Sequence, residues 1–151
     1  RLGFSVQISH VIHTFNQSET LNFLRFVNQR WARRVSTVIS FAAPTGLARD
    51  RGAEMIPDMA KSTRVVRDAL AFAKRNGMNG SVTGYCGIPP CLLGEYSGYS
   101  VVAQRREVIN NKPHHIKLDA CYGCHNQDYC PGLWRDYVGL WGDPGLVTMI
   151  R

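Results

Sequence analysis

Three cysteines crowd into one short segment, where Cys121 and Cys124 form a Cys-x2-Cys pair and Cys130 follows after five intervening residues. Thiolates at this spacing can bind a metal ion or an iron–sulfur cluster. Because three thiols seldom complete such a site, we expect a fourth ligand upstream. Cys91 is the favoured candidate, since two prolines before it restrict the backbone, and Cys86 is the alternative.

Spacing alone leaves two kinds of metal site open. Structural zinc commonly uses two Cys-x2-Cys pairs, whereas this chain has one, which favours iron and sulfide. Pro131 follows Cys130 and fits the first position of a helix, whose free N–H groups would favour a negatively charged cluster. His125 lies inside the cysteine loop and is a possible substitute for a thiolate, but a solvent-facing histidine is the favoured interpretation.

Composition and charge narrow the class of protein. The chain has 151 residues, enough for one domain or for part of a larger protein, and no apolar run of about 18 residues, so no membrane contact is expected. Five cysteines, an odd number at ligand-like spacing, favour metal binding in the cytoplasm over disulfides. The net charge of +7 arises from scattered basic residues, which is typical of a solvated surface and does not favour nucleic acid as a partner.

Alternating apolar patterns predict the first part of the fold. Apolar runs predict three strands, at residues 4–13, 35–42 and 81–85. Between them, residues 16–34 and 62–76 repeat apolar side chains every three to four positions and predict helices. Asn16 and Glu19 have the spacing of a capping box at the start of the first helix, and a polar loop is expected at 49–58. This order predicts a parallel α/β sheet.

From Leu92 onward the sequence is richer in Gly, Tyr and Ser and predicts a second, smaller unit. Strands at 99–108 and 114–118 are expected to form a β-hairpin through a turn at 110–112, because asparagine tolerates positive φ. A short amphipathic helix is expected to follow Pro131 and to end at Gly142.

Two groups of residues carry a resemblance to a known enzyme family. Residues 4–16, and 35–48 with Pro44 and Gly46, are similar to the fifth and sixth strands of a partial (β/α) TIM-like barrel, that of the radical S-adenosylmethionine enzymes. The Gly-Ile-Pro-Pro-Cys turn that ends at Cys91, together with the three-cysteine loop, is similar to the auxiliary-cluster extension of the SPASM/Twitch type in that family.

The resemblance implies both a domain organisation and a function. Residues 1–91 would form the C-terminal half of the barrel, and residues 92–151 a cysteine-rich domain of a β-hairpin plus helix. It implies an auxiliary [4Fe–4S] cluster held by Cys91, Cys121, Cys124 and Cys130. Such a cluster would relay an electron during modification of a peptide or small-molecule substrate, with a flavodoxin or ferredoxin as electron donor.

The sequence also departs from the family. It contains neither the Cys-x3-Cys-x2-Cys loop that binds the catalytic cluster nor the Gly-Gly-Glu segment that holds S-adenosylmethionine. We therefore expect a C-terminal fragment that is inactive alone, with the second [4Fe–4S] cluster and S-adenosylmethionine bound only by the full-length protein.

Candidate pocket residues follow the expected strands. Active sites of barrel enzymes lie at the C-terminal ends of the strands, so Asn16, Pro44 and Gly46 are the candidate cofactor-binding residues, although helix capping is the favoured explanation for Asn16. Catalytic residues cannot be assigned. Two alternative functions remain open: a zinc-binding module without catalysis, and a radical enzyme that acts on nucleic acid.

Overall fold

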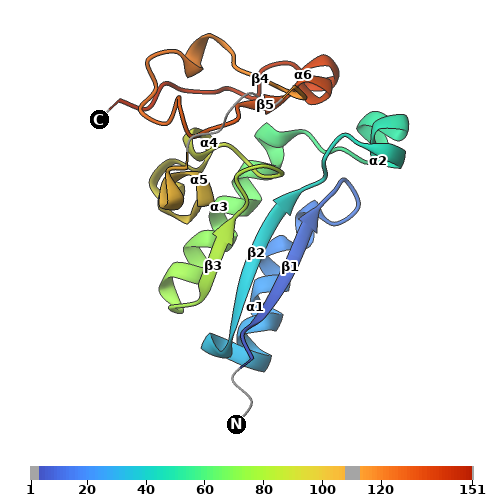
Figure 1. Ribbon diagram of the computed structural model, residues 1–151. Coiled ribbons are helices and arrows are strands. Elements are labelled where there is room, and N and C mark those ends of the chain that lie inside the picture. The colour runs from blue at the N-terminus through green and yellow to red at the C-terminus, as the bar shows by residue number, and fades with distance from the viewer. Residues whose placement is uncertain (1–3, 108–112, 151) are drawn as a thin grey trace.

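A three-stranded parallel sheet forms the first part of the structure, a computed structural model that describes residues 4–107 and 113–150 (Figure 1). Both strand pairs are parallel, which confirms the predicted α/β class. The strands lie in sequence order across the sheet: β1 (Val6–Ile12), β2 (Val35–Phe41) and β3 (Asn79–Val82).

Two long helices cover one face of this sheet. α1 (Thr20–Trp31) connects β1 to β2, α3 (Met59–Arg75) connects β2 to β3, and both lie behind the sheet in Figure 1. Side chains that alternate along β2 point toward them and are buried, whereas the residues between are half-buried. The other face carries both polar and apolar side chains: Gln7, Ser9, Ser36, Ser40 and Ser81 together with Val11 and Val38.

The ends of α3 follow from local sequence. The Asp58 carboxylate accepts a hydrogen bond from the backbone N–H of Ala60 at 2.9 Å and caps the first turn. Gly77 has φ +59 just past the last turn, as the sequence predicts, because glycine adopts this conformation without steric cost. None of the helices in the described ranges is long and apolar enough to cross a membrane.

The start of α1 differs from the capping-box prediction. Asn16 precedes a 3₁₀ turn (Gln17–Glu19) and its side chain makes no capping hydrogen bond, so α1 begins only at Thr20. Instead Asn16 Oδ1 accepts from the His13 N–H at 2.8 Å, and Nδ2 donates to the Val11 carbonyl at 2.9 Å. The amide therefore ties the turn to the end of β1.

A further helix occupies the predicted polar loop. α2 (Gly46–Arg51) follows β2, and a 3₁₀ turn (Gly52–Glu54) leads on toward α3. Its arginines and aspartate face solvent, so an apolar stripe, the signal that would have predicted a helix, is missing.

The predicted hairpin is wrong. Residues 90–105 are helical: α4 (Pro90–Leu93), the 3₁₀ helix η4 (Gly94–Tyr99) and α5 (Val101–Arg105). They place Leu92, Leu93 and Val102 in the interior, and this burial overrides the β propensity of valine and tyrosine. Of the strand predicted at 99–108, the described residues form one isolated β-bridge, between Val82 and Ser100. The turn predicted at 110–112 lies outside the described residues.

A different antiparallel pair frames the cysteine loop. β4 (His115–Ile116) pairs with β5 (Leu133–Trp134), so the whole three-cysteine loop connects two paired strands. The predicted C-terminal helix is present as α6 (Arg135–Trp141) and ends at Gly142 as expected. It begins later than predicted, because Leu133 and Trp134 extend along β4 instead.

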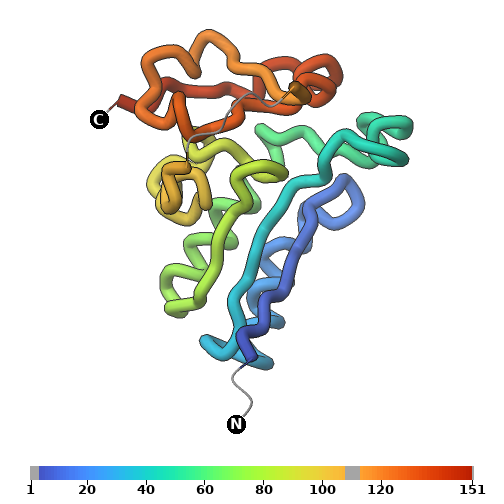
Figure 2. The backbone as a smooth tube through the Cα atoms, viewed as in Figure 1, coloured from blue at the N-terminus to red at the C-terminus, as the bar shows by residue number. Residues whose placement is uncertain are grey.

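Residues 113–150, which we call the cysteine unit, sit above the C-terminal ends of the parallel strands (Figures 1 and 2). Tyr137 of α6 is 1% exposed and packs edge-on against Phe41, the last residue of β2, with 6.2 Å between ring centroids. The Trp141 indole N–H donates to the Ile56 carbonyl at 3.1 Å. Buried residues of both parts form one continuous core, and a domain boundary at residue 91 stays a prediction.

Replacing Tyr137 with phenylalanine should destabilise the contact between the cysteine unit and α3. The Tyr137 hydroxyl accepts a hydrogen bond from the Met59 N–H at 2.8 Å, which belongs to the first turn of α3 and has no partner within the helix. Losing this acceptor leaves a buried N–H unpaired, at a cost of about 1–3 kcal/mol. Urea unfolding would measure the difference in the free energy of unfolding between wild type and Tyr137→Phe. Tyr122→Phe, the same substitution at a position that is 63% exposed, is the control. Equal stabilities for both variants would contradict this role.

Acidification should destabilise the fold through His10. Burial, and to a smaller extent the nearby His13, lower the pKa of His10 below its ordinary value of 6.5. The His10 ring is held in place by a hydrogen bond between its Nε2 and the Thr20 hydroxyl at 3.1 Å and by stacking on Phe23. The folded state therefore disfavours the charged form, and the stability present above pH 6.5 is lost as pH falls through the lowered folded-state pKa. His10→Gln should flatten this part of the profile in denaturation measured between about pH 5 and 8; an unchanged slope would exclude His10 as the cause.

Candidate metal centre

Four of the five cysteines line one cavity. Cys91 approaches from α4, and Cys121, Cys124 and Cys130 from the loop between β4 and β5. The space between the surrounding residues that a water-sized molecule can enter is about 20 Å³, and the cavity is partly open to solvent. The pKa values of Cys91 and Cys130 both respond to the neighbouring thiols, which places the sulfurs within mutual electrostatic reach.

Local turns hold the loop cysteines in place. The backbone N–H of Cys124 donates to the Cys121 carbonyl at 3.4 Å, and that of Cys130 donates to the Asn126 carbonyl at 2.8 Å. Gly123, between the two turns, has φ +76, a conformation that favours glycine. These bonds fold the Cys-x2-Cys pair and Cys130 back toward the same space.

The proline turn positions the remaining cysteine. Pro89 and Pro90 precede Cys91, and Pro90 occupies the first position of α4, where the missing N–H costs no hydrogen bond. The rigid backbone brings Cys91 to the cavity from an element that also packs on α3, so the cavity joins the cysteine unit to the rest of the fold.

Backbone N–H groups point at the sulfurs. The Gly132 N–H donates to Cys130 Sγ at 3.5 Å, and the Val147 N–H bonds the Cys91 sulfur. Gly132 is required at its position, since a Cβ there would overlap the Ile116 carbonyl oxygen and φ is +84. Hydrogen bonds of this kind stabilise a thiolate.

Burial disfavours the charged thiolate form of the same cysteines. It raises the pKa of Cys91 and of Cys121, and it raises that of Cys130 to about 11, with the neighbouring cysteines contributing further. Thiolates gathered in such a place repel one another, and a bound metal cation supplies the compensating positive charge.

The four thiols line the cavity without converging on one point. Within residues 4–107 and 113–150, no three His, Cys, Asp or Glu side chains come close enough together to hold a single metal ion. The four thiols nevertheless surround one space, so they are wall residues of a cavity and do not converge on one point. Four sulfur donors around a cavity fit the ligand set of an iron–sulfur cluster.

The C-terminal segment closes one side of the cavity. Leu146, Val147 and Met149 line it, and the segment runs back across the cysteine unit (Figure 2). The His125 N–H and ring Nδ1 both bond the Met149 carbonyl, at 2.9 and 3.0 Å. The His125 ring is therefore used to hold this segment, and His125 is not among the residues that line the cavity.

Cys86 lies apart from this arrangement. It follows β3, its carbonyl accepts a hydrogen bond from the Phe41 N–H, and it is not among the cavity residues. Burial raises the pKa of its thiol as well. The structure thus brings together the four cysteines chosen from the sequence and leaves Cys86 outside, although ligation itself stays a prediction.

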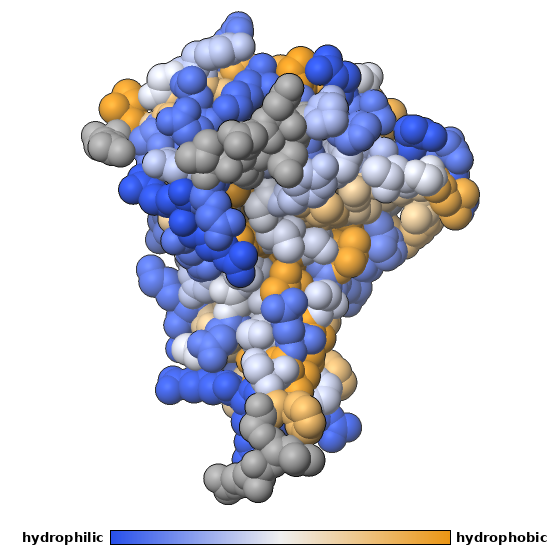
Figure 3. Space-filling model, viewed as in Figure 1, coloured by the Kyte–Doolittle hydropathy of each residue, from blue (hydrophilic) through white to orange (hydrophobic). Residues whose placement is uncertain are grey.

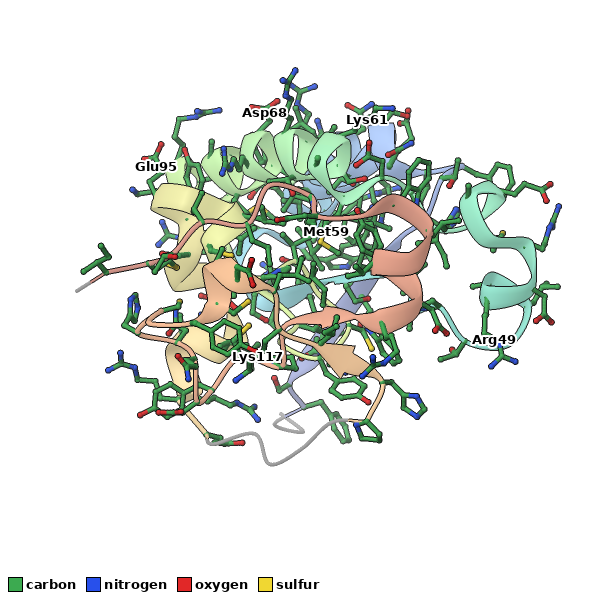
Figure 4. The ribbon with its side chains drawn as sticks, turned by 90° about the horizontal axis from the view of Figure 1, so that it is seen from above. Arg49, Met59, Lys61, Asp68, Glu95 and Lys117 are labelled. Atoms are coloured by element: carbon green, nitrogen blue, oxygen red, sulfur yellow. The ribbon has the colours of Figure 1, made fainter. Side chains whose placement is uncertain are left out.

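The predicted cofactor-binding residues do not join the cysteine cavity. Asn16 and Gly46 follow β1 and β2, at the C-terminal edge of the sheet as expected, but Asn16 is occupied in its turn. Pro44 lines a separate surface hollow with Arg49 and Asp136. Figure 4 shows Arg49 on α2, far from Lys117 and the cysteine unit's centre. Their role in binding a cofactor stays a prediction.

Sequence reasoning missed two features of the cavity wall. Lys117 and Asn126 both line it, and the Lys117 ammonium group donates to the Gln127 carbonyl. Spacing rules for metal ligands give no signal for such residues, because an ammonium group or an amide supports a sulfur site without binding the metal.

Comparison with known proteins found no relative of this chain. No protein-family model matches the chain, and searches of curated proteins and of solved structures found no match. The resemblance to radical S-adenosylmethionine enzymes therefore stays a prediction made from the sequence.

Proposed function

We propose that this chain is the C-terminal part of a radical S-adenosylmethionine enzyme and that it holds an auxiliary [4Fe–4S] cluster. The observation that carries the proposal is the cavity lined by Cys91, Cys121, Cys124 and Cys130. These are the four thiols of the auxiliary-cluster resemblance, and they come from segments about thirty residues apart that the fold could have left separate.

We favour iron and sulfide over zinc because the chain has one Cys-x2-Cys pair, whereas structural zinc commonly uses two. A structural zinc ion draws four ligands to one point, at sulfur distances of about 2.3 Å. The N–H groups of Gly132 and Val147 on two of the sulfurs favour the net negative charge of an iron–sulfur cluster.

The residues around the cavity define what it does chemically. A bound cluster supplies one-electron transfer. Four cysteines would complete its ligation, so the chain's own contribution is to fix the thiolates and to cover one side of the cavity with Leu146, Val147 and Met149. We infer electron relay to or from a substrate, with a flavodoxin or ferredoxin as the protein partner.

The sheet supports the barrel part of the proposal. Both long helices pack on one face, and the other face, which carries serines and Gln7 beside Val11 and Val38, has no helix on it in Figure 1, as in the interior of an open (β/α) barrel. A hollow on this face is lined by Gln7, Tyr85, Arg105 and Tyr129, among others. We place a peptide or small-metabolite substrate there, and the cofactor near Asn16, Pro44 and Gly46.

The full-length protein tests this function. Expressed together with its encoded upstream sequence, purified without oxygen and reduced, it should cleave S-adenosylmethionine to deoxyadenosine and methionine, whereas the present chain should not. Chromatography of the reaction measures both products. A full-length protein with intact clusters that forms no deoxyadenosine would exclude the radical enzyme.

A further inference from the structure

The side chain of Lys117 is anchored in the wall of the cysteine cavity. Lys117 is half-buried, and both it and Gln127 line the cavity. Its ammonium group donates a hydrogen bond to the Gln127 carbonyl. A methyl group placed on Gly132 would lie 3.4 Å from Lys117 Cγ, so the lysine stem passes close to the backbone there. The side chain therefore reaches across the segment from Gly132 to Gln127, which carries Cys130.

No ion pair neutralises this ammonium group within the part of the chain that the structure describes. The ion pairs of residues 4–107 and 113–150 lie on α2, on the turn after it and at the start of α3. The charge of Lys117 acts on the cavity instead. Burial is the main cause of the raised pKa of Cys121, and against it Lys117 favours the thiolate more strongly than Asp143 opposes it.

We propose that the Lys117 ammonium group raises the reduction potential of the bound cluster. The inference rests on the proposed function, since it requires a cluster in the cavity. Reduction adds one electron, and therefore one negative charge, to the cluster and its thiolates. A positive charge held beside them stabilises the reduced state more than the oxidised state, and partial burial strengthens the effect. Entry of one electron into the cluster is thereby favoured over its loss.

Three substitutions separate the charge of Lys117 from its structural contacts. Arginine keeps the positive charge and the hydrogen-bond donors. Glutamine keeps an N–H that can reach toward the Gln127 carbonyl but has no charge, and methionine keeps only an apolar stem of similar length. A lysine that merely ties the loop together is replaceable by glutamine, whereas one that acts through its charge is replaceable only by arginine.

Midpoint potentials of the reconstituted wild-type chain and of these variants test the proposal. In Lys117→Met and Lys117→Gln, the equilibrium constant for one-electron reduction should fall about tenfold, equivalent to 59 mV, whereas Lys117→Arg should stay close to wild type. Lys61→Met is the matched control, because it removes the same charge at a side chain that is 79% exposed. Figure 4 shows Lys61 on α3, well away from Lys117. This control should keep the wild-type potential.

Four results would contradict the account, and they are distinct. Iron-loaded Lys117→Met and Lys117→Gln with the wild-type potential would overturn the proposal. So would a lowered potential in Lys117→Met alone, which would assign the effect to the hydrogen bond, or a Lys117→Arg variant that behaves like Lys117→Met. Loss of the cluster from both uncharged variants would replace the proposal by a role in cluster assembly. A wild-type chain that binds no cluster would instead overturn the proposed function.

Discussion

Cys130→Ser should lose nearly all iron and sulfide after anaerobic reconstitution, whereas Cys86→Ser should retain the wild-type amounts. Cys130 lines the cavity with three other cysteines, and burial, with a smaller contribution from its neighbours, raises its pKa to about 11. Serine there is a poor iron ligand, because its hydroxyl is a much weaker donor to iron than a thiolate. Iron and acid-labile sulfide assays measure the outcome.

Cys86→Ser is a matched control because it makes the same substitution at a half-buried cysteine outside the cavity. Cys91→Ser, Cys121→Ser and Cys124→Ser should behave like Cys130→Ser, since a cluster with one ligand lost is exposed to hydrolysis. Equal loss in Cys86→Ser, or full retention in Cys91→Ser, would reverse the assignment of the fourth ligand.

Removing iron with a chelator should expose the backbone of the cysteine unit to hydrogen exchange while α1 and α3 stay protected. β4 and β5 are only two residues each, and the loop between them depends on short turns and on the cavity. If the cluster is present at about 100 times its dissociation constant, linkage stabilises the unit by ~2.7 kcal/mol. Protection at residues 113–135 and 143–150 should then fall by about a hundredfold.

The helices provide the internal control for this experiment. α1 and α3 bury Leu24, Val27, Val66 and Leu70 against the sheet and take no part in the cavity. Their protection should therefore be the same with and without iron. Unchanged protection of the cysteine loop after complete iron loss would mean that the turns alone hold it, and a loss spread evenly over α3 would mean global unfolding.

The sequence predicted those parts of the fold in which local pattern and burial agree. The first two strands, α3 and its glycine cap at Gly77 follow from apolar periodicity and backbone conformation, and the structure has all of them. The third strand lies earlier than the predicted 81–85, at Asn79–Val82. The prediction of a strand over residues 99–105 was wrong, because Val102 gains more from burial in a short helix than from its strand propensity. α2 was not predicted, because an exposed helix without an apolar stripe has no periodic pattern of apolar residues in its sequence.

The site shows the same division. Thiol spacing and the proline turn identified the four cysteines that line the cavity, since ligand chemistry leaves a mark in sequence. The pairing of β4 with β5 could not be foreseen, because two-residue strands carry no period. Asn126 could not be identified from the sequence either, since only its burial and its unpaired oxygen distinguish it.

Metal and sulfide analysis of the anaerobically reconstituted wild-type chain, combined with Mössbauer spectroscopy, tests the central claim most directly. The account predicts about four iron and four sulfide per chain, in a single cluster with four cysteine ligands. It also predicts that zinc supplied alongside iron and sulfide does not displace them. One zinc ion per chain with no sulfide would contradict the account and would make the cavity a structural zinc site.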